Sequence, residues 1–123
     1  YSALYGLDIQ YLSYGMGDRR LPEVMEVAIF RIFQECINNI VKHAIAEHVD
    51  MKLVYAHPAI IVTITDDGIG FDPDNVADMG IGLRIMKQRA LELNGTLKIF
   101  SEPSKGTTIR VEFPAPNNCY EEM

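Results

Sequence analysis

Apolar residues recur with two different periods along this chain. Short stretches bounded by turn residues predict strands at residues 5–13, 50–55, 59–65, 96–101 and 107–113. A helical period predicts one helix from Pro22 to about His48 and another from Gly82 to about Leu93. Pro22 suits a first helical position, where its missing N–H does no harm. Asn94 and Gly95 are typical of a helix end.

Strands and helices interleave along the chain, and two pairs of strands are close enough to form hairpins. Residues 56–58 would close the first hairpin, and residues 102–106 the second. This order predicts an α+β fold with a mixed, mostly antiparallel sheet and helices packed on one face. Residues 1–116 are expected to form one domain, and residues 117–123 a frayed C-terminal tail.

Length and composition set limits on function. The 123 residues, 48% of them hydrophobic, can bury one core without a metal or a disulfide. A formal charge of −6 argues against nucleic acid or an anionic membrane as the main partner, because phosphate contacts need basic surface. No apolar run approaches the length of a membrane span, and no signal peptide is expected. Cys36 and Cys119 do not suggest a disulfide framework, so a reduced, cytoplasmic setting is expected.

One face of the first predicted helix carries an acid, an amide and a cation. At about 100° per residue, Glu35, Asn39 and Lys42 fall on one narrow stripe. The apolar residues lie roughly opposite, so the helix should rest them on the sheet and turn the polar stripe outward. Such a stripe fits an ordinary solvated face. It also fits a magnesium site, since a carboxylate and an amide one turn apart supply oxygen ligands.

The strand at residues 59–65 ends on an aspartate that should point into the protein. Asp66 shares parity with Ile60, Val62 and Ile64, and side chains of one parity lie on one face of a sheet. A carboxylate aimed at an apolar layer is costly unless a group donates hydrogen bonds to it. The exocyclic amine of adenine is such a donor, while capping of the following turn is the alternative. Thr107 follows the same parity logic in the last strand.

Two glycine pairs flank a short polar segment. Gly68 and Gly70 follow the inward aspartate, and Gly80 and Gly82 precede the second helix. Glycine lets a backbone approach a ligand closely, and free N–H groups at a helix start favour phosphate. Residues 71–79 between the pairs are interpreted as a small mobile lid. Taken alone, Gly-Ile-Gly can also be a turn followed by a helix start.

At these residues the sequence resembles the ATP-binding catalytic domain of sensor histidine kinases. Residues 34–44 (QECINNIVKHA) resemble the asparagine box, in the subfamily with Glu in place of a first Asn. Residues 66–72 (DDGIGFD) and 80–90 (GIGLRIMKQRA) look like the two glycine boxes, and residues 101–107 (SEPSKGT) are similar to the closing Gly-Thr segment. The resemblance covers residues 21–114. It implies the two-layer α/β sandwich of the Bergerat-type ATP-binding fold, with ATP and Mg²⁺ as ligands.

The resemblance also implies roles for individual residues. Asp66 would bind the adenine amine with help from Thr107, Asn39 would coordinate magnesium, and Glu35 would act as the base. The remaining expected ATP-binding positions are Lys42, His43, Gly68, Gly70, Gly80, Gly82 and Leu83. In such a site, positioning and charge neutralisation carry most of the catalysis.

The family's phosphoryl acceptor is a histidine usually followed by an acidic residue. His43, His48 and His57 do not fit, because Ala, Val and Pro follow them. The resemblance therefore implies that the acceptor lies on a separate dimerisation domain of the same kinase, with a response regulator downstream. The chain alone is expected to be a cytoplasmic monomer, inactive in autophosphorylation without that domain, whether or not the longer protein is anchored in a membrane.

Two other functions remain open at this stage. One is an ATP-driven clamp like that of gyrase B, in which the glutamate activates water; the short lid counts against it. The other is a non-catalytic module that binds a nucleotide and docks a partner; the intact Glu35, Asn39 and Asp66 count against it. Arg84 and Lys87, one turn apart, fit either phosphate contacts or a solvated surface.

Overall fold

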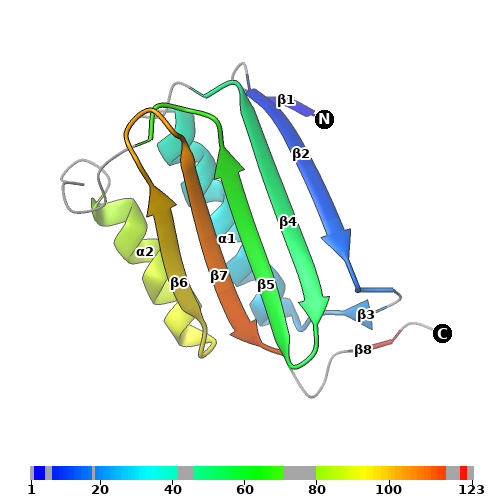
Figure 1. The fold of residues 1–123 in the computed structure, drawn as a ribbon. Helices are drawn as coiled ribbons and strands as arrows, with labels where there is room; N and C mark the ends of the chain where they lie inside the picture. The colour runs from blue at the N-terminus through cyan, green and yellow to red at the C-terminus, as the bar shows by residue number, and fades with distance from the viewer. Residues whose placement is uncertain are drawn as a thin grey trace.

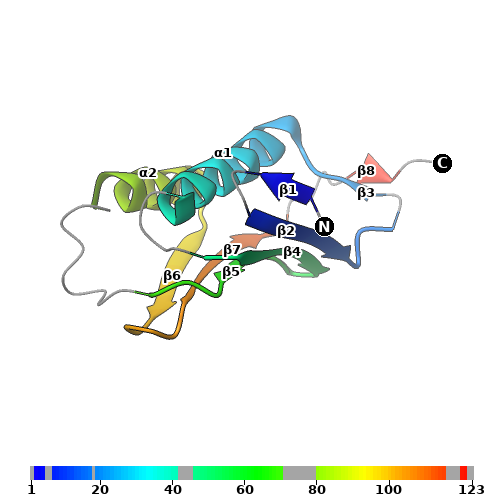
Figure 2. The ribbon, with the colours of Figure 1, turned by 90° about the horizontal axis from the view of Figure 1, so that it is seen from above.

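The computed structural model describes residues 2–4, 7–17, 19–41, 46–70, 80–115 and 120–121. Two helices cover one face of a six-stranded sheet, which makes the two-layer sandwich expected from the sequence (Figures 1 and 2). The helices are α1 (Glu23–Asn39) and α2 (Gly80–Glu92). The sheet contains β1 (Ser2–Leu4), β2 (Leu7–Tyr14), β4 (His48–Ala56), β5 (Ala59–Asp66), β6 (Thr96–Ser101) and β7 (Thr107–Pro114).

The sheet is mixed and mostly antiparallel, as predicted. Its strand order is β1-β2-β4-β5-β7-β6, and β2 with β4 is the parallel pair. The hairpins β4–β5 and β6–β7 lie where the sequence indicated. β5 and β7 pair along their whole lengths, from Ala59 opposite Pro114 to Asp66 opposite Thr107. The starting end of β7 therefore lies beside the finishing end of β5.

The hydrophobic core lies between the helices and the sheet. In β5 the residues Ile60 and Val62 are fully buried, while Ile61 and Thr63 face the other side. The same alternation in β7 buries Phe113 completely. Burial of one such side chain contributes roughly 1.5–3 kcal/mol. The alternation that identified these strands is therefore also what holds the two layers together.

The first helix was predicted to run to about His48, and that boundary is wrong because His48 begins β4. Pro22 precedes α1 as expected, α1 ends at Asn39, and Ile40 and Val41 continue it in π-helical form up to the last residue described before position 46. His48 pairs in parallel with Asp8 of β2, and its backbone N–H donates to Asp67 Oδ1 at 2.9 Å. These distant partners hold the chain extended there, which a local helical period does not reveal.

The end of the second helix agrees with the sequence. The Gly95 N–H donates to the Ala90 carbonyl at 2.8 Å, and Asn94 adopts a left-handed φ of 59°. A side chain at Gly95 would lie 2.7 Å from the ring of Phe113, so close packing excludes one. The glycine thus lets the helix end pack directly onto the core.

Other boundaries moved by a few residues. The predicted first strand corresponds mainly to β2, with β1 pairing antiparallel to it. In the stretch expected to be a frayed tail, Tyr120–Glu121 form a short strand, β8, opposite β3 (Arg19–Arg20). Within the described part of the chain, neither helix has the length and apolar character needed to cross a bilayer.

Candidate functional site

Glu35 and Asn39 of α1 face the first turn of α2. A Cβ built on Gly82 would lie 3.1 Å from both amide atoms of Asn39 and 3.4 Å from Glu35 Oε2. Both side chains are half-buried, so the expectation that they turn outward needs correction. The reason is that α2 packs alongside α1 on the same sheet face (Figure 2). Glycine at position 82 leaves the space between the helices open beside an acid and an amide.

The first turn of α2 contains three predicted phosphate contacts, Gly80, Gly82 and Leu83. The Leu83 side chain is buried in the core, so only its backbone is placed to contact a phosphate, as the prediction requires. The first four N–H groups of a helix have no partner within it and favour an anion. Lys42, His43 and the predicted lid at residues 71–79 lie outside the described residues.

Asp66 points into the protein, as its parity predicted. It is 7% exposed, and its Oδ1 accepts a hydrogen bond from the Gly68 N–H at 2.8 Å. Burial raises the pKa of its carboxyl group. Oδ1 therefore caps the turn that follows β5, which was the alternative role considered for Asp66. No described residue donates to Oδ2, which leaves that oxygen able to accept from a ligand.

Thr107 lies opposite Asp66 and is 8% exposed. Among the described residues, Asp66 and Thr107 are the polar side chains that are buried. The Thr107 hydroxyl lies 2.8 Å from the Ser101 hydroxyl, which in turn donates to the Gly106 carbonyl at 3.1 Å. The sequence predicted Thr107 but assigned nothing to Ser101. Its position opposite Thr107 across the second hairpin was the available signal.

The glycine loop after β5 packs against the turn between β6 and β7. Gly70 and Gly106 have φ of 65° and 76°. A Cβ on Gly70 would collide with the Glu102 carbonyl, and one on Gly106 with the Asp66 carbonyl. Positive φ and backbone contact each exclude a side chain. These glycines are thus needed by the protein's own packing, in addition to any approach of a ligand.

A charged network beside the site was not predicted. Asp67 Oδ1 accepts the backbone N–H groups of Glu47 and His48, each at 2.9 Å, and Oδ2 lies 2.8 Å from His48 Nδ1. Asp8 Oδ2 lies 3.6 Å from His48 Nε2. The hydrogen bonds from His48, its backbone first, lower the pKa of Asp67 to about 2. The bond to Asp67 raises the pKa of His48. The network holds the glycine loop to the start of β4.

This network predicts a pH dependence of stability. The Asp67 contribution is present above its ordinary pKa of 3.8 and is lost as the pH falls through the lowered value. The His48 contribution is present below its ordinary pKa of 6.5 and is lost as the pH rises through the raised value. Both contributions are fully present between pH 3.8 and pH 6.5, so His48→Gln should lower the melting temperature most in that range. The decrease should be at most about 4 °C because the pair is exposed.

Thermal melts of the parent and His48→Gln across this pH range provide the measurement. His57→Gln is the matched control, since His57 is exposed in the β4–β5 turn at the other end of the hairpin. A difference between parent and His48→Gln that grows as the pH rises above the His48 pKa would contradict the assignment.

Cys36 is buried where α1 packs against α2. It is 1% exposed, and its Sγ is 3.3 Å from Met86 Sδ on α2. Burial, followed by the negative charges of Glu35 and Asp66, raises the pKa of its thiol. Cys36 therefore remains a protonated core residue, as its place on the apolar side of α1 predicted.

The side chains at this site limit how a magnesium ion could be bound. The described residues contain no group of three or more His, Cys, Asp or Glu side chains arranged to hold a metal ion. A magnesium ion here would therefore take most of its ligands from phosphate oxygens and water, as it commonly does in nucleotide sites. The Asn39 amide oxygen, beside the start of α2, fits one protein ligand of this kind.

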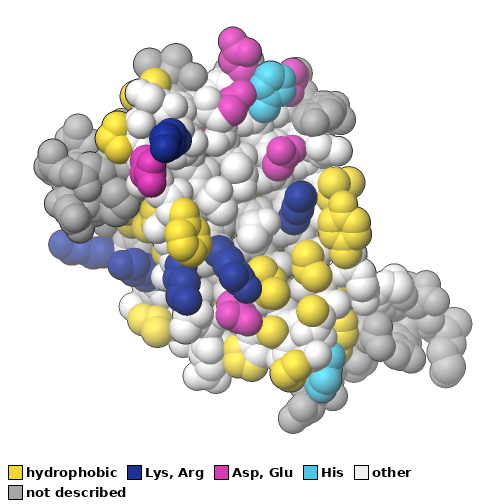
Figure 3. Space-filling view, viewed as in Figure 1, with side chains coloured by type: hydrophobic (Ala, Val, Ile, Leu, Met, Phe, Trp, Pro, Cys, Tyr) yellow, Lys and Arg dark blue, Asp and Glu magenta, His cyan; other side chains and the backbone are white. Residues whose placement is uncertain are grey.

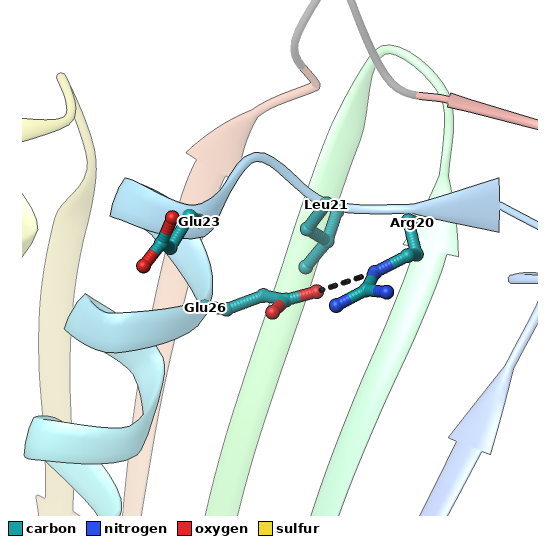
Figure 4. Close-up of a pocket in the computed structure, with 4 residues that line it drawn as sticks. All are labelled: Arg20, Leu21, Glu23 and Glu26. Carbon is teal, nitrogen blue, oxygen red and sulfur yellow. Dashed lines mark ion pairs between the residues drawn. The ribbon is translucent and has the colours of Figure 1, made fainter.

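Two other surface features lie apart from this site. On the open face of the sheet, Lys52, Arg110 and Lys98 follow one cross-strand row. Figure 3 shows that Lys and Arg side chains lie beside hydrophobic ones on this face. At the start of α1, a hollow of about 490 Å³ is lined by Arg20, Leu21, Glu23 and Glu26 (Figure 4). Arg20 Nε lies 3.8 Å from Glu26 Oε1 there. At about 1.5 Å per residue, this hollow is about 18 Å along α1 from Glu35.

Known proteins are similar to this chain in sequence. The chain is 38% identical over 109 residues to the signal transduction histidine-protein kinase/phosphatase DegS of Brevibacillus brevis, covering 89% of this chain and 28% of that protein. It is 36% identical over 97 residues to the sensor protein VraS of Staphylococcus haemolyticus, covering 79% and 28%. The chain thus spans 28% of the length of either relative.

A solved structure shares the fold at lower identity. The Erythrobacter litoralis EL346 blue-light activated histidine kinase superposes with a TM-score of 0.74 at 20% identity, over 92% of this chain and 36% of that one. A family profile described as "Histidine kinase-, DNA gyrase B-, and HSP90-like ATPase" matches residues 25–117. The sensor-kinase resemblance noted in the sequence is thereby confirmed, and the chain belongs to this family of ATPases.

Proposed function

We propose that this chain binds ATP with magnesium and donates the γ-phosphoryl group to a histidine on a separate dimerisation domain of the same kinase. The observation that carries the proposal is the arrangement of two polar pairs. Buried Asp66 and Thr107 lie at the finishing end of β5, and Glu35 with Asn39 lies against the open first turn of α2. The Asp66–Thr107 pair suits a nucleobase with an exocyclic amine, and the Glu35–Asn39 pair suits a metal-bound phosphate.

Each predicted residue has a role in this proposal. Asp66 accepts from the adenine amine with Thr107 beside it, Asn39 ligates magnesium, and Glu35 acts as the base toward the attacking histidine. The remaining contacts to the nucleotide and its phosphates come from Lys42, His43, Gly68, Gly70, Gly80, Gly82 and Leu83. When bound, magnesium would neutralise part of the phosphate charge. This would allow a domain with a formal charge of −6 to bind an anionic nucleotide.

The partners follow from the same proposal. Residues 1–116 form the catalytic domain, which works in the cytoplasm with a phosphoacceptor domain and a response regulator. The relatives named above are a histidine-protein kinase/phosphatase and a sensor protein, and each is much longer than this chain. Glu35 in the position of the first Asn supports the Glu-containing subfamily of these kinases.

Asn39→Ala tests the magnesium assignment. Removing the amide oxygen should weaken ATP binding about tenfold in magnesium, the effect of about one charge-assisted contact. The same substitution should have little effect when magnesium is replaced by a chelator. Isothermal titration calorimetry with ATP, with and without magnesium, makes the comparison.

Asn38→Ala is the matched control, because the neighbouring amide is exposed on another face of α1. It should bind ATP like the parent chain under both conditions. Equal losses in Asn39→Ala with and without magnesium would instead make Asn39 a contact to the nucleotide itself. Unchanged binding in both conditions would remove Asn39 from the site.

A further inference from the structure

The second hairpin closes on a chain of two hydroxyl groups and a carbonyl. Ser101 ends β6, Thr107 begins β7, and the two are paired across the hairpin. Their hydroxyl oxygens are 2.8 Å apart, and Ser101 Oγ lies 3.1 Å from the Gly106 carbonyl oxygen. The position of that carbonyl is set by the positive φ of Gly106 and its packing on the Asp66 backbone.

The Ser101–Gly106 hydrogen bond favours one order of the protons in this chain. A carbonyl oxygen carries no proton, so Ser101 is the donor to Gly106. Either hydroxyl could be the donor in the 2.8 Å contact, but a hydroxyl group has a single proton, so when Ser101 donates to Gly106 it is Thr107 that donates to Ser101. The proton of Thr107 is then committed to the hairpin. What Thr107 can offer a ligand is an oxygen lone pair.

Asp66 adds a second acceptor at the same place. It lies directly opposite Thr107 across the β5–β7 pair, and its Oδ1 is already bonded to the Gly68 N–H. Directly opposite side chains on one sheet face have Cβ atoms about 5 Å apart. An ionised carboxylate accepts hydrogen bonds and donates none. The floor of the site therefore presents two acceptors and no donor from these residues.

We propose that Ser101 is a positioning residue that makes Thr107 an obligate acceptor, so that Thr107 and Asp66 together select a 6-amino purine over a 6-oxo purine. This inference rests on the proposed binding of ATP in this site. The amine of adenine brings protons to the two acceptors, directly or through water. The 6-oxo group of hypoxanthine or guanine would bring a third acceptor, and buried acceptors without a proton between them are costly.

Loss of the Ser101 hydroxyl should relax this selection. In Ser101→Ala the Thr107 proton is released and its hydroxyl can rotate to donate toward a 6-oxo group. The ratio of the dissociation constants for inosine triphosphate and ATP should fall about 3- to 10-fold, the effect of about one hydrogen bond. Ser101→Thr keeps the hydroxyl and should retain the parent ratio. A ratio reports selectivity, which a general loosening of the hairpin would leave unchanged.

The experiment is calorimetry of the chain with magnesium plus either ATP or inosine triphosphate. The matched control is Thr108→Val, which removes a neighbouring hydroxyl whose partner is Thr65 on the opposite face of the sheet. It should keep the parent ratio. Melting temperatures of each variant record any loss of folded protein. If Ser101→Ala unfolds, Ser101→Thr and Ser101→Cys still compare a retained hydroxyl with a thiol, which is a weaker acceptor for the Thr107 proton.

The outcomes separate this inference from the proposed function. If Asp66→Asn weakens ATP binding but Ser101→Ala keeps the parent ratio, the proton order assigned to Ser101 is wrong. An equal fall in Ser101→Thr or Thr108→Val would also overturn it. If the parent chain binds neither nucleotide, or Asp66→Asn binds ATP as well as the parent, the proposed adenine contact fails and the Ser101 assignment falls with it.

Discussion

Replacing Asp66 with Asn is expected to weaken ATP binding by about 10- to 100-fold, the effect of losing one hydrogen bond to a charged group. The reason lies in the Gly68 N–H, which requires an oxygen at the Oδ1 position. An asparagine that keeps this bond must place its NH₂ group where Oδ2 was. A donor then meets the donor amine of adenine. Calorimetry with ATP and magnesium measures the loss.

Asp67→Asn is the matched control for this substitution. Asp67 is adjacent and acidic but exposed, and it bonds to the start of β4. It should cost some stability and leave ATP affinity within about threefold of the parent, since an asparagine oxygen can still accept the backbone N–H groups that hold the glycine loop. Burial raises the pKa of Asp66, so affinity should hold above that pKa and fall as the pH drops through it. Tight binding in Asp66→Asn would place adenine elsewhere.

Glu35→Gln is expected to reduce phosphoryl transfer by about 10²- to 10⁴-fold, the usual contribution of a general base. Glutamine has nearly the same shape and can keep the position beside Gly82, but it does not accept the proton of an attacking histidine. ATP affinity should stay within about threefold, because a base acts in the transition state more than in binding. The measurement is acid-labile, base-stable phosphate on a separately supplied acceptor domain.

Glu23→Gln is the control, since Glu23 is exposed on the same helix near the distant hollow (Figure 4). Transfer at the full rate in Glu35→Gln would contradict the base assignment. Two further outcomes identify the alternative functions. Hydrolysis of ATP without transfer to the acceptor would favour an ATP-driven clamp. Tight binding with neither hydrolysis nor transfer would favour a nucleotide-binding interaction module.

The sequence by itself determined which side of each strand faces the core and where α2 ends. Ile60, Val62 and Asp66 share parity, and parity follows from the pleat of a strand whatever the strand pairs with. For the same reason the inward direction of Thr107 was predictable. Asn94 ends a helix through its own backbone conformation. These features depend on a few consecutive residues, so local rules were enough to predict them.

The tertiary structure alone decided what those side chains meet. Glu35 and Asn39 face Gly82 because α2 packs beside α1, and a helical wheel carries no information about a neighbouring helix. Asp67 and His48, 19 residues apart, meet because β4 and β5 form one hairpin, and that pairing puts His48 in a strand where a helix was expected. The role proposed for Ser101 depends in the same way on partners that only the hairpin brings together.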